Sequence, residues 1–159
     1  MNDKELAQLA RDTAKKAYAP YSNFRVGAAL ITDSGNIYTG CNIENVSYPA
    51  TVCGEDVAVL KAISEGETKI DVLAVACIDA DDEAIFPCGV SRQRMSEFGV
   101  EDVIVVHKES FKKYKFDDVL PYNNKIKFKD YIFSFNLGIT LSVSQTFPKS
   151  DNWKIGASS

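Results

Sequence analysis

The order in which strand-like and helix-like segments follow one another constrains the fold of this chain most. Strands are expected at 24–32, 37–41, 71–79 and 101–107, where apolar and β-branched residues concentrate. The sequence Asp-Ser-Gly-Asn joins the first two strands and favours a hairpin, whereas helical segments of about ten residues separate the later strands. Strands that alternate with helices are typical of a helix-flanked sheet, and the opening hairpin makes that sheet mixed. The predicted fold class is therefore α/β.

Three helices are expected beside these strands. The first ends before Pro20, because apolar and small residues recur ahead of it at three- and four-residue spacing. The second covers 52–66 with Thr51 as its N-cap, and the third covers 88–99. A short helical segment is expected at 116–120.

The pattern changes after residue 128. Residues 1–128 are predicted to form one domain, and residues 129–159 are predicted to form a C-terminal extension. Apolar residues alternate with polar or small ones over 133–143, which favours an edge strand or a hairpin, and the last stretch is polar. The sequence assigns no function to this extension.

The composition limits the class of protein. Hydrophobic residues at 45% and charged residues at 25% are ordinary values for a globular chain. A net charge of −4 and a pI near 5.0 argue against a protein that coats nucleic acid. The N-terminal segment is charged, and no apolar run approaches the ~20 residues that a membrane span needs. We therefore expect a cytoplasmic protein that binds a small molecule, with no nucleic-acid or membrane partner.

Two short motifs carry the chemistry. Cys53-Gly54-Glu55 and Pro87-Cys88-Gly89-Val90-Ser91 both lie at the start of a predicted helix. The positive end of a helix dipole lowers the pKa of a thiol, and the thiolate is the form that binds a metal. Two converging helix starts can present the thiolates of Cys53 and Cys88 to one Zn²⁺, and positions 88 and 91 face the same side of their helix. Cys41 and Cys77 lie inside strand patterns and are expected to pack in the core. His107 is expected either at the surface or with its hydrogen bonds satisfied, rather than as a metal ligand.

A zinc ion with three protein ligands keeps one position open for a water, whose pKa falls to about 7. A carboxylate two residues from a ligand can move that water's proton, which is the role expected for Glu55. Zinc-dependent deaminases carry His-x-Glu or a three-cysteine variant, followed by Pro-Cys-x-x-Cys. The two motifs of this chain follow that pattern, with Ser91 at the last position.

The chain resembles the small, homotetrameric cytidine deaminases. Four blocks carry the resemblance over about residues 5–122: AYAPYSNFRVGAAL (17–30), YTGCNIENVSY (38–48), TVCGEDVAVLKAISEG (51–66) and PCGVSRQRMSEFG (87–99). The resemblance implies a three-layer fold and the zinc-dependent deamination of cytidine or deoxycytidine to uridine or deoxyuridine, a step of pyrimidine salvage. It also implies a homotetramer.

The same resemblance implies a role for each matching residue. Cys53 and Cys88 match zinc ligands, with Ser91 at the third position, and Glu55 matches the proton shuttle. The remaining matches bind substrate: Asn42 and Glu44 hydrogen-bond the ribose 3′-hydroxyl, Phe24 packs on the pyrimidine, Gly54 lies beside it, and Tyr48 serves a neighbouring subunit's site.

Three departures from the family pattern matter. Ser91 replaces a zinc cysteine, and Asp56 replaces an arginine that follows the catalytic glutamate. The two changes can be linked, since three thiolates leave an excess negative charge on the zinc site and two leave none. Asp56 could supply an oxygen to the metal or its water, and Arg92 could help to balance the thiolate charge, whereas Arg94 is expected in a surface or interface salt bridge. The aromatic residue that closes a neighbouring pocket has no match at the usual spacing, where the chain offers Tyr122 or Phe128.

Two readings of the function therefore stay open. One is an active cytidine deaminase, favoured by Glu55, Asn42 and Glu44. The other is a catalytically impaired protein of the same fold, favoured by Ser91 and Asp56, that binds a nucleoside or acts as a partner or scaffold subunit. A shifted substrate that keeps its sugar is a variant of the first.

Overall fold

The computed structural model describes residues 1–80, 85–108, 110–123, 132–135 and 139–142. Residues Met1–Asn123 form one compact unit and Asn124–Ser159 form another. The predicted boundary between residues 128 and 129 lies outside the described residues. In the second unit, β6 (Ile132–Phe135) pairs antiparallel with β7 (Ile139–Ser142).

The first unit is built on a five-stranded mixed sheet in the order β2-β1-β3-β4-β5. The strands are β1 (Val26–Thr32), β2 (Ile37–Cys41), β3 (Ile70–Cys77), β4 (Asp102–His107) and β5 (Ser110–Lys115). Among the described strand pairs of this sheet, β3–β4 is parallel and the others are antiparallel, including those of β1 with β2 and with β3. The predicted hairpin and the predicted mixed sheet are thereby confirmed.

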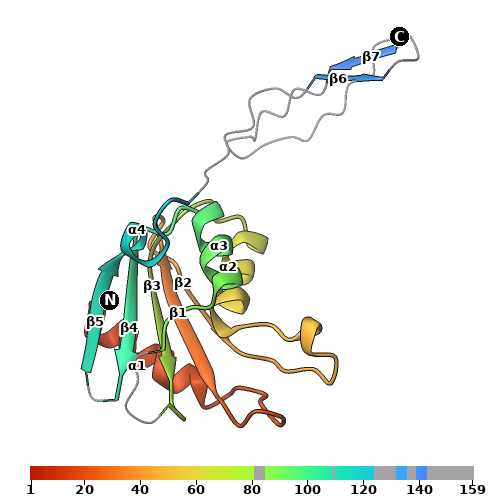
Figure 1. Cartoon of the computed structure of the whole chain (residues 1–159). Helices are drawn as coiled ribbons and strands as arrows, with labels where there is room; N and C mark the ends of the chain where they lie inside the picture. Colours follow the sequence, from red (N-terminus) through yellow and green to blue (C-terminus); the bar gives the residue numbers. More distant parts are fainter. Residues whose placement is uncertain (81–84, 109, 124–131, 136–138, 143–159) are drawn as a thin grey trace. The chain divides into compact units, whose positions relative to one another are not determined.

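Helices cover both faces of this sheet (Figure 1). Helix α1 (Asp3–Ala14) packs on one face, where Leu6, Ala29 and Ile104 belong to one buried cluster. Helices α2 (Gly54–Ser64) and α3 (Gly89–Glu97) pack on the other face, over a second cluster that includes Leu73 and Met95. The short helix α4 (Phe116–Val119) contributes Phe116 and Val119 to that second cluster. The three layers confirm the predicted α/β fold class.

Two glycines let the sheet approach its helices closely. A Cβ atom at Gly27 would lie 2.3 Å from backbone atoms of α1, and one at Gly40 would lie 2.4 Å from backbone atoms of α2. Larger side chains at these positions would push the helices away from the sheet. The close approach at Gly40 holds the first turns of α2 against β2.

The first helix ends at Ala14, before Pro20 as predicted, and a loop carries the chain from there to β1. The N-cap of the second helix was predicted wrongly, and one strand was missed. Thr51 is not the N-cap of α2, because Tyr48–Ala50 forms a 3₁₀ turn (η1) and the Thr51 hydroxyl accepts a hydrogen bond from the Asn45 amide. Strand β5 was not expected, because its side chains are mostly exposed and polar, as in other edge strands.

None of the helices in the described part of the chain has the length and apolar content that a membrane crossing requires.

Candidate active site

The starts of α2 and α3 lie side by side over the same face of the sheet (Figure 1), and each is capped by a cysteine. Cys53 and Cys88 are the N-cap residues, in extended conformation, and neither side chain is used to cap its own helix. Their sulfur atoms are 3.8 Å apart. The Ser91 hydroxyl, on the first turn of α3, lies 3.5 Å from the Cys88 sulfur and also hydrogen-bonds to Cys53. The structure therefore brings together the three predicted metal ligands.

These distances can be compared with a tetrahedral zinc site. With Zn–S bonds of about 2.3 Å and a Zn–O bond of about 2.0–2.2 Å, two sulfurs would be about 3.8 Å apart, and a sulfur and an oxygen about 3.5 Å apart. The Cys53–Cys88 and Cys88–Ser91 distances agree with both values. No group of three or more His, Cys, Asp or Glu side chains in the described ranges could hold a metal, and the Ser91 hydroxyl is the further oxygen beside the two sulfurs. The set fits zinc in spacing, with one donor weaker than a thiolate.

The two thiols titrate in opposite directions. Burial acts against ionisation of Cys88, but hydrogen bonds with Ser91, Cys53 and the Val90 amide hold its pKa below the ordinary value. Burial, followed by the charge of the Glu55 carboxylate, raises the pKa of Cys53 well above its ordinary value. The prediction that both helix starts favour a thiolate is therefore right for Cys88 and wrong for Cys53 in the metal-free chain. A metal ion at this site has to displace the proton of Cys53.

Glu55, on the first turn of α2, is the buried carboxyl group beside the thiols. Only 4% of the residue is exposed, and burial, with a smaller contribution from the charge of Asp56, raises its pKa to about 7. A carboxyl group that titrates near neutral pH can both accept and release a proton under physiological conditions. The electrostatics of Glu55 therefore suit a general acid and base.

The burial of Glu55 predicts a pH-dependent stability of the metal-free chain. Its pKa rises from 4.5 to about 7 on folding, because the buried site favours the protonated carboxyl group. The folded chain is therefore most stable below pH 4.5, and it loses this stability as the pH rises through 7 and the buried carboxyl group ionises. Relative to Glu55→Gln, the free energy of unfolding should fall by about 3 kcal/mol over this window. Urea denaturation of both proteins in chelator, at several pH values, measures the difference. If the difference in unfolding free energy between the native chain and Glu55→Gln did not change with pH, the prediction would be contradicted.

Three charged residues, Asp56, Arg92 and Arg94, follow the proposed ligands in the sequence and make the contacts described next. Asp56 is 4% exposed and pairs through its Oδ2 atom with Arg94 of α3, so Arg94 binds a buried carboxylate rather than a surface one. Within the part of the chain that the structure describes, Asp56 belongs to no group of three or more His, Cys, Asp or Glu side chains that could hold a metal. Arg92 donates to the carbonyl oxygens of Pro87 at 2.7 Å and Val119 at 3.1 Å. Arg92 thus joins the turn before Cys88 to the end of α4.

Asn42 and Glu44 hold the loop that leads into β1. The Asn42 side chain accepts from the Val26 amide at 2.8 Å and donates to the Phe24 carbonyl at 2.9 Å. The Glu44 carboxylate accepts from the amides of Tyr21 and Ser22 and from the Ser22 hydroxyl, and these bonds lower its pKa. Each side chain keeps capacity for another hydrogen bond, namely a second amide hydrogen on Asn42 and free lone pairs on Glu44.

The remaining predicted residues lie in the loops around the site. Phe24 is half-buried, and its carbonyl oxygen accepts a hydrogen bond from the Asn42 side chain. Gly54 is the first residue of α2. Tyr48 is 69% exposed on η1, with its ring centroid 6.3 Å from that of Tyr21. Tyr122 is fully exposed, and Phe128 lies outside the described residues.

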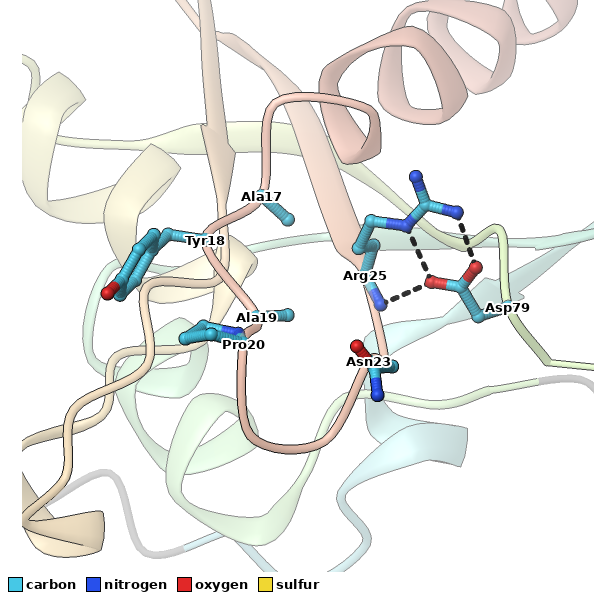
Figure 2. A pocket seen from close by; sticks show the side chains of 7 residues that line it. All are labelled: Ala17, Tyr18, Ala19, Pro20, Asn23, Arg25 and Asp79. Carbon is cyan, nitrogen blue, oxygen red and sulfur yellow. Dashed lines mark hydrogen bonds and ion pairs between the residues drawn. The ribbon is translucent and has the colours of Figure 1, made fainter.

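A cavity of about 420 Å³, which the sequence did not indicate, lies beside the loop that follows α1. Figure 2 shows its lining residues: Ala17, Tyr18, Ala19, Pro20, Asn23, Arg25 and Asp79. Arg25 and Asp79 form a two-point ion pair at 2.6 and 2.9 Å. Arg25 directly precedes β1 and Asp79 follows β3, so the pair joins the ends of these two strands. This cavity contains neither of the two capping cysteines.

Comparisons with known proteins agree on one family. Residues 1–107 match the model of the cytidine and deoxycytidylate deaminase zinc-binding region. A probable cytidine deaminase of Dictyostelium discoideum is 45% identical over 109 residues, which are 67% of this chain and 74% of that protein. A cytidine deaminase of Mycobacterium tuberculosis is 40% identical over 112 residues, 70% of this chain and 81% of that protein.

Solved structures give the same result. The crystal structure of a cytidine deaminase from Burkholderia pseudomallei has a TM-score of 0.73 and 36% identity, and the match covers 78% of this chain and all of that one. The cytidine deaminase structure from Mycobacterium tuberculosis has a TM-score of 0.69 and 34% identity, over 79% and 99% of the two chains.

Proposed function

This chain belongs to the cytidine and deoxycytidylate deaminase family, and from that membership we propose that it hydrolyses cytidine or deoxycytidine to uridine or deoxyuridine and ammonia, as a step of pyrimidine salvage. The observation that carries the proposal is the spacing of the Cys53, Cys88 and Ser91 side chains beside the buried carboxyl of Glu55. We propose that these three side chains hold Zn²⁺. When bound, the ion would make a water molecule nucleophilic at neutral pH.

Glu55 carries the proton transfers in this proposal. Its carboxylate accepts one proton from the attacking water and delivers it to N3 of the pyrimidine, then accepts the second proton from the hydroxyl now on C4 and delivers it to the leaving amine. A pKa near 7 allows both directions of transfer without a large energetic penalty. Water adds at C4 and ammonia leaves from the same carbon, so the reaction consumes one water for each ammonia released.

The loops position the nucleoside. The free amide hydrogen of Asn42 and the free lone pairs of Glu44 bind the 3′-hydroxyl of the sugar, while Phe24 packs on the pyrimidine beside Gly54. Tyr48 is exposed because it serves the site of a neighbouring copy in a cytoplasmic homotetramer. The direct test of the function is incubation of the purified chain with cytidine, following uridine and ammonia, which should appear in equal amounts.

One observation favours a second function. A hydroxyl is a weaker zinc donor than a thiolate, so Ser91 is compatible with a chain that binds a nucleoside without deaminating it, or that acts as a partner or scaffold subunit. Calorimetry with cytidine, run beside the turnover assay, separates the two. Binding without metal and without ammonia release would establish the second function and overturn the first.

The sugar contact predicts discrimination against 3′-deoxycytidine. Loss of a hydrogen bond to a charged group costs about 1.5–3 kcal/mol, so kcat/KM should be roughly 10- to 100-fold lower than with cytidine. Glu44→Gln should lower kcat/KM for cytidine and bring the ratio of the two substrates close to one. Both substrates are assayed with both proteins under the same conditions.

Glu67→Gln is the matched control. Like Glu44, Glu67 accepts several hydrogen bonds, in its case from Ser34 and Asn36. It follows the end of α2, whereas Cys53 caps the start of that helix. That variant should keep the preference of the native chain. A Glu44→Gln variant that lost thermal stability but kept the full preference for cytidine would show that Glu44 only holds its loop.

A further inference from the structure

The two helices that carry Cys53 and Cys88 are joined by one buried ion pair. Asp56 stands three residues after Cys53 on α2, and Arg94 stands six residues after Cys88 on α3. The Asp56 side chain is 5% exposed and the Arg94 side chain 33% exposed, so the pair lies between the helices with its carboxylate buried. Any shift of α3 along or away from α2 has to separate these two charges.

Separating this pair is costly because the carboxylate has little other support. Asp56 Oδ1 has no hydrogen-bond partner within the described residues, so Arg94 is the group that compensates the charge, through Oδ2. A buried charge that loses its partner destabilises a protein strongly, whereas the intact pair holds a defined geometry. The ion pair therefore constrains the position of α3 relative to α2, and with it the relative position of the two capping cysteines.

This constraint matters more here than it would with three thiolates. Only two strong donors are present, and the third is the hydroxyl of Ser91, so metal–ligand bonds contribute less to holding the sulfurs at 3.8 Å. The family pattern described above has an arginine at position 56. In this chain that position is an aspartate, and the guanidinium comes from the facing helix instead.

We propose that Arg94, through its ion pair with Asp56, is a positioning residue that holds Cys88 at metal-binding distance from Cys53. The consequence for metal affinity rests on the proposed function, whereas the control of the sulfur spacing does not. Arg94 contacts neither substrate nor metal in this account and acts only through the packing of α3 on α2.

The test compares the native chain with Arg94→Met, Arg94→Lys and a matched control. Asp79→Asn is that control, because it breaks an ion pair, that of Asp79 with Arg25, in which neither residue belongs to α2 or α3. Metal-free proteins are titrated with phenylarsine oxide, which bridges two nearby thiols, and with Cd²⁺, whose thiolate charge-transfer absorbance reports binding. Cys53→Ala gives the background from the other cysteines, and thermal denaturation shows that each variant is folded.

Arg94→Met should weaken Cd²⁺ binding by about 10- to 100-fold, the usual effect of losing a group that orients metal ligands. It should weaken phenylarsine oxide binding as well, Arg94→Lys should restore part of both, and Asp79→Asn should match the native chain. Native affinity for both probes in folded Arg94→Met would overturn the proposal, as would an equal loss in Asp79→Asn.

A second variant covers the case in which Arg94→Met does not fold. Asp56→Asn with Arg94→Met removes the buried charge together with its partner, and its affinity for both probes should again be below that of the native chain. Native affinity in this double variant would overturn the proposal.

The two claims fail separately. A native chain that binds the arsenical but neither holds zinc nor releases ammonia contradicts the proposed function alone. A native chain that does both, with unchanged probe binding in Arg94→Met, contradicts the positioning role alone.

Discussion

Glu55→Gln is expected to lower kcat for cytidine by about 10²- to 10⁴-fold, the usual contribution of a positioned general acid and base. Glutamine keeps the shape of the side chain but can neither accept the water's proton nor deliver it to the pyrimidine. The residue is only 4% exposed, so bulk water does not readily replace its carboxyl group as the proton carrier. Steady-state assays of both proteins at matched zinc content measure the effect.

The control for this change is Glu65→Gln. Glu65 is an exposed carboxylate at the other end of the same helix, and its loss should leave kcat unchanged. A Glu55→Gln variant with more than about one tenth of native turnover would mean that another group moves the protons.

Cys88→Ser is expected to abolish stoichiometric zinc binding and turnover together. The variant would leave one thiolate and two hydroxyl groups at the site, and hydroxyl groups are not among the usual zinc ligands. Cys88 also carries the thiol whose pKa is lowered in the metal-free chain, so it is the group that is most readily a thiolate before the metal arrives. Metal analysis of the dialysed protein measures the loss.

Two further variants bracket this result. Cys77→Ser changes a half-buried thiol at the end of β3 that is not one of the proposed ligands, and should keep both zinc and turnover. Ser91→Cys should bind zinc more tightly than the native chain because it completes three thiolates. Retention of zinc by Cys88→Ser, or no gain of affinity in Ser91→Cys, would contradict the assignment of the ligands.

The sequence predicted the convergence of the two helix starts because each carries a local signal. Pro87 and the glycines at 66 and 99 mark helix boundaries, and the apolar strands between them leave few ways to arrange the layers. The same reasoning failed for β5, whose exposed side chains have no apolar pattern, and for the N-cap of α2. There, the 3₁₀ turn at Tyr48–Ala50 takes the chain into the helix at Cys53 itself.

Local sequence patterns could not predict the contacts between segments that are distant in the sequence. The unusual Asp56 was visible in the sequence, but its pairing with Arg94 depends on how α2 and α3 pack. The raised pKa of Cys53 likewise depends on the depth at which its helix start is buried and on the nearby Glu55 carboxylate. The loop-holding bonds of Asn42 and Glu44 also appear only when the loop and β1 are placed in space.

The measurement that tests the central claim most directly is a titration of the metal-free chain with Zn²⁺, in which bound metal and cytidine turnover are recorded on the same samples. We expect turnover to rise in proportion to bound zinc and to level off at one ion per chain. Cytidine binding that is unaffected by zinc, with no ammonia released at full occupancy, would contradict the account.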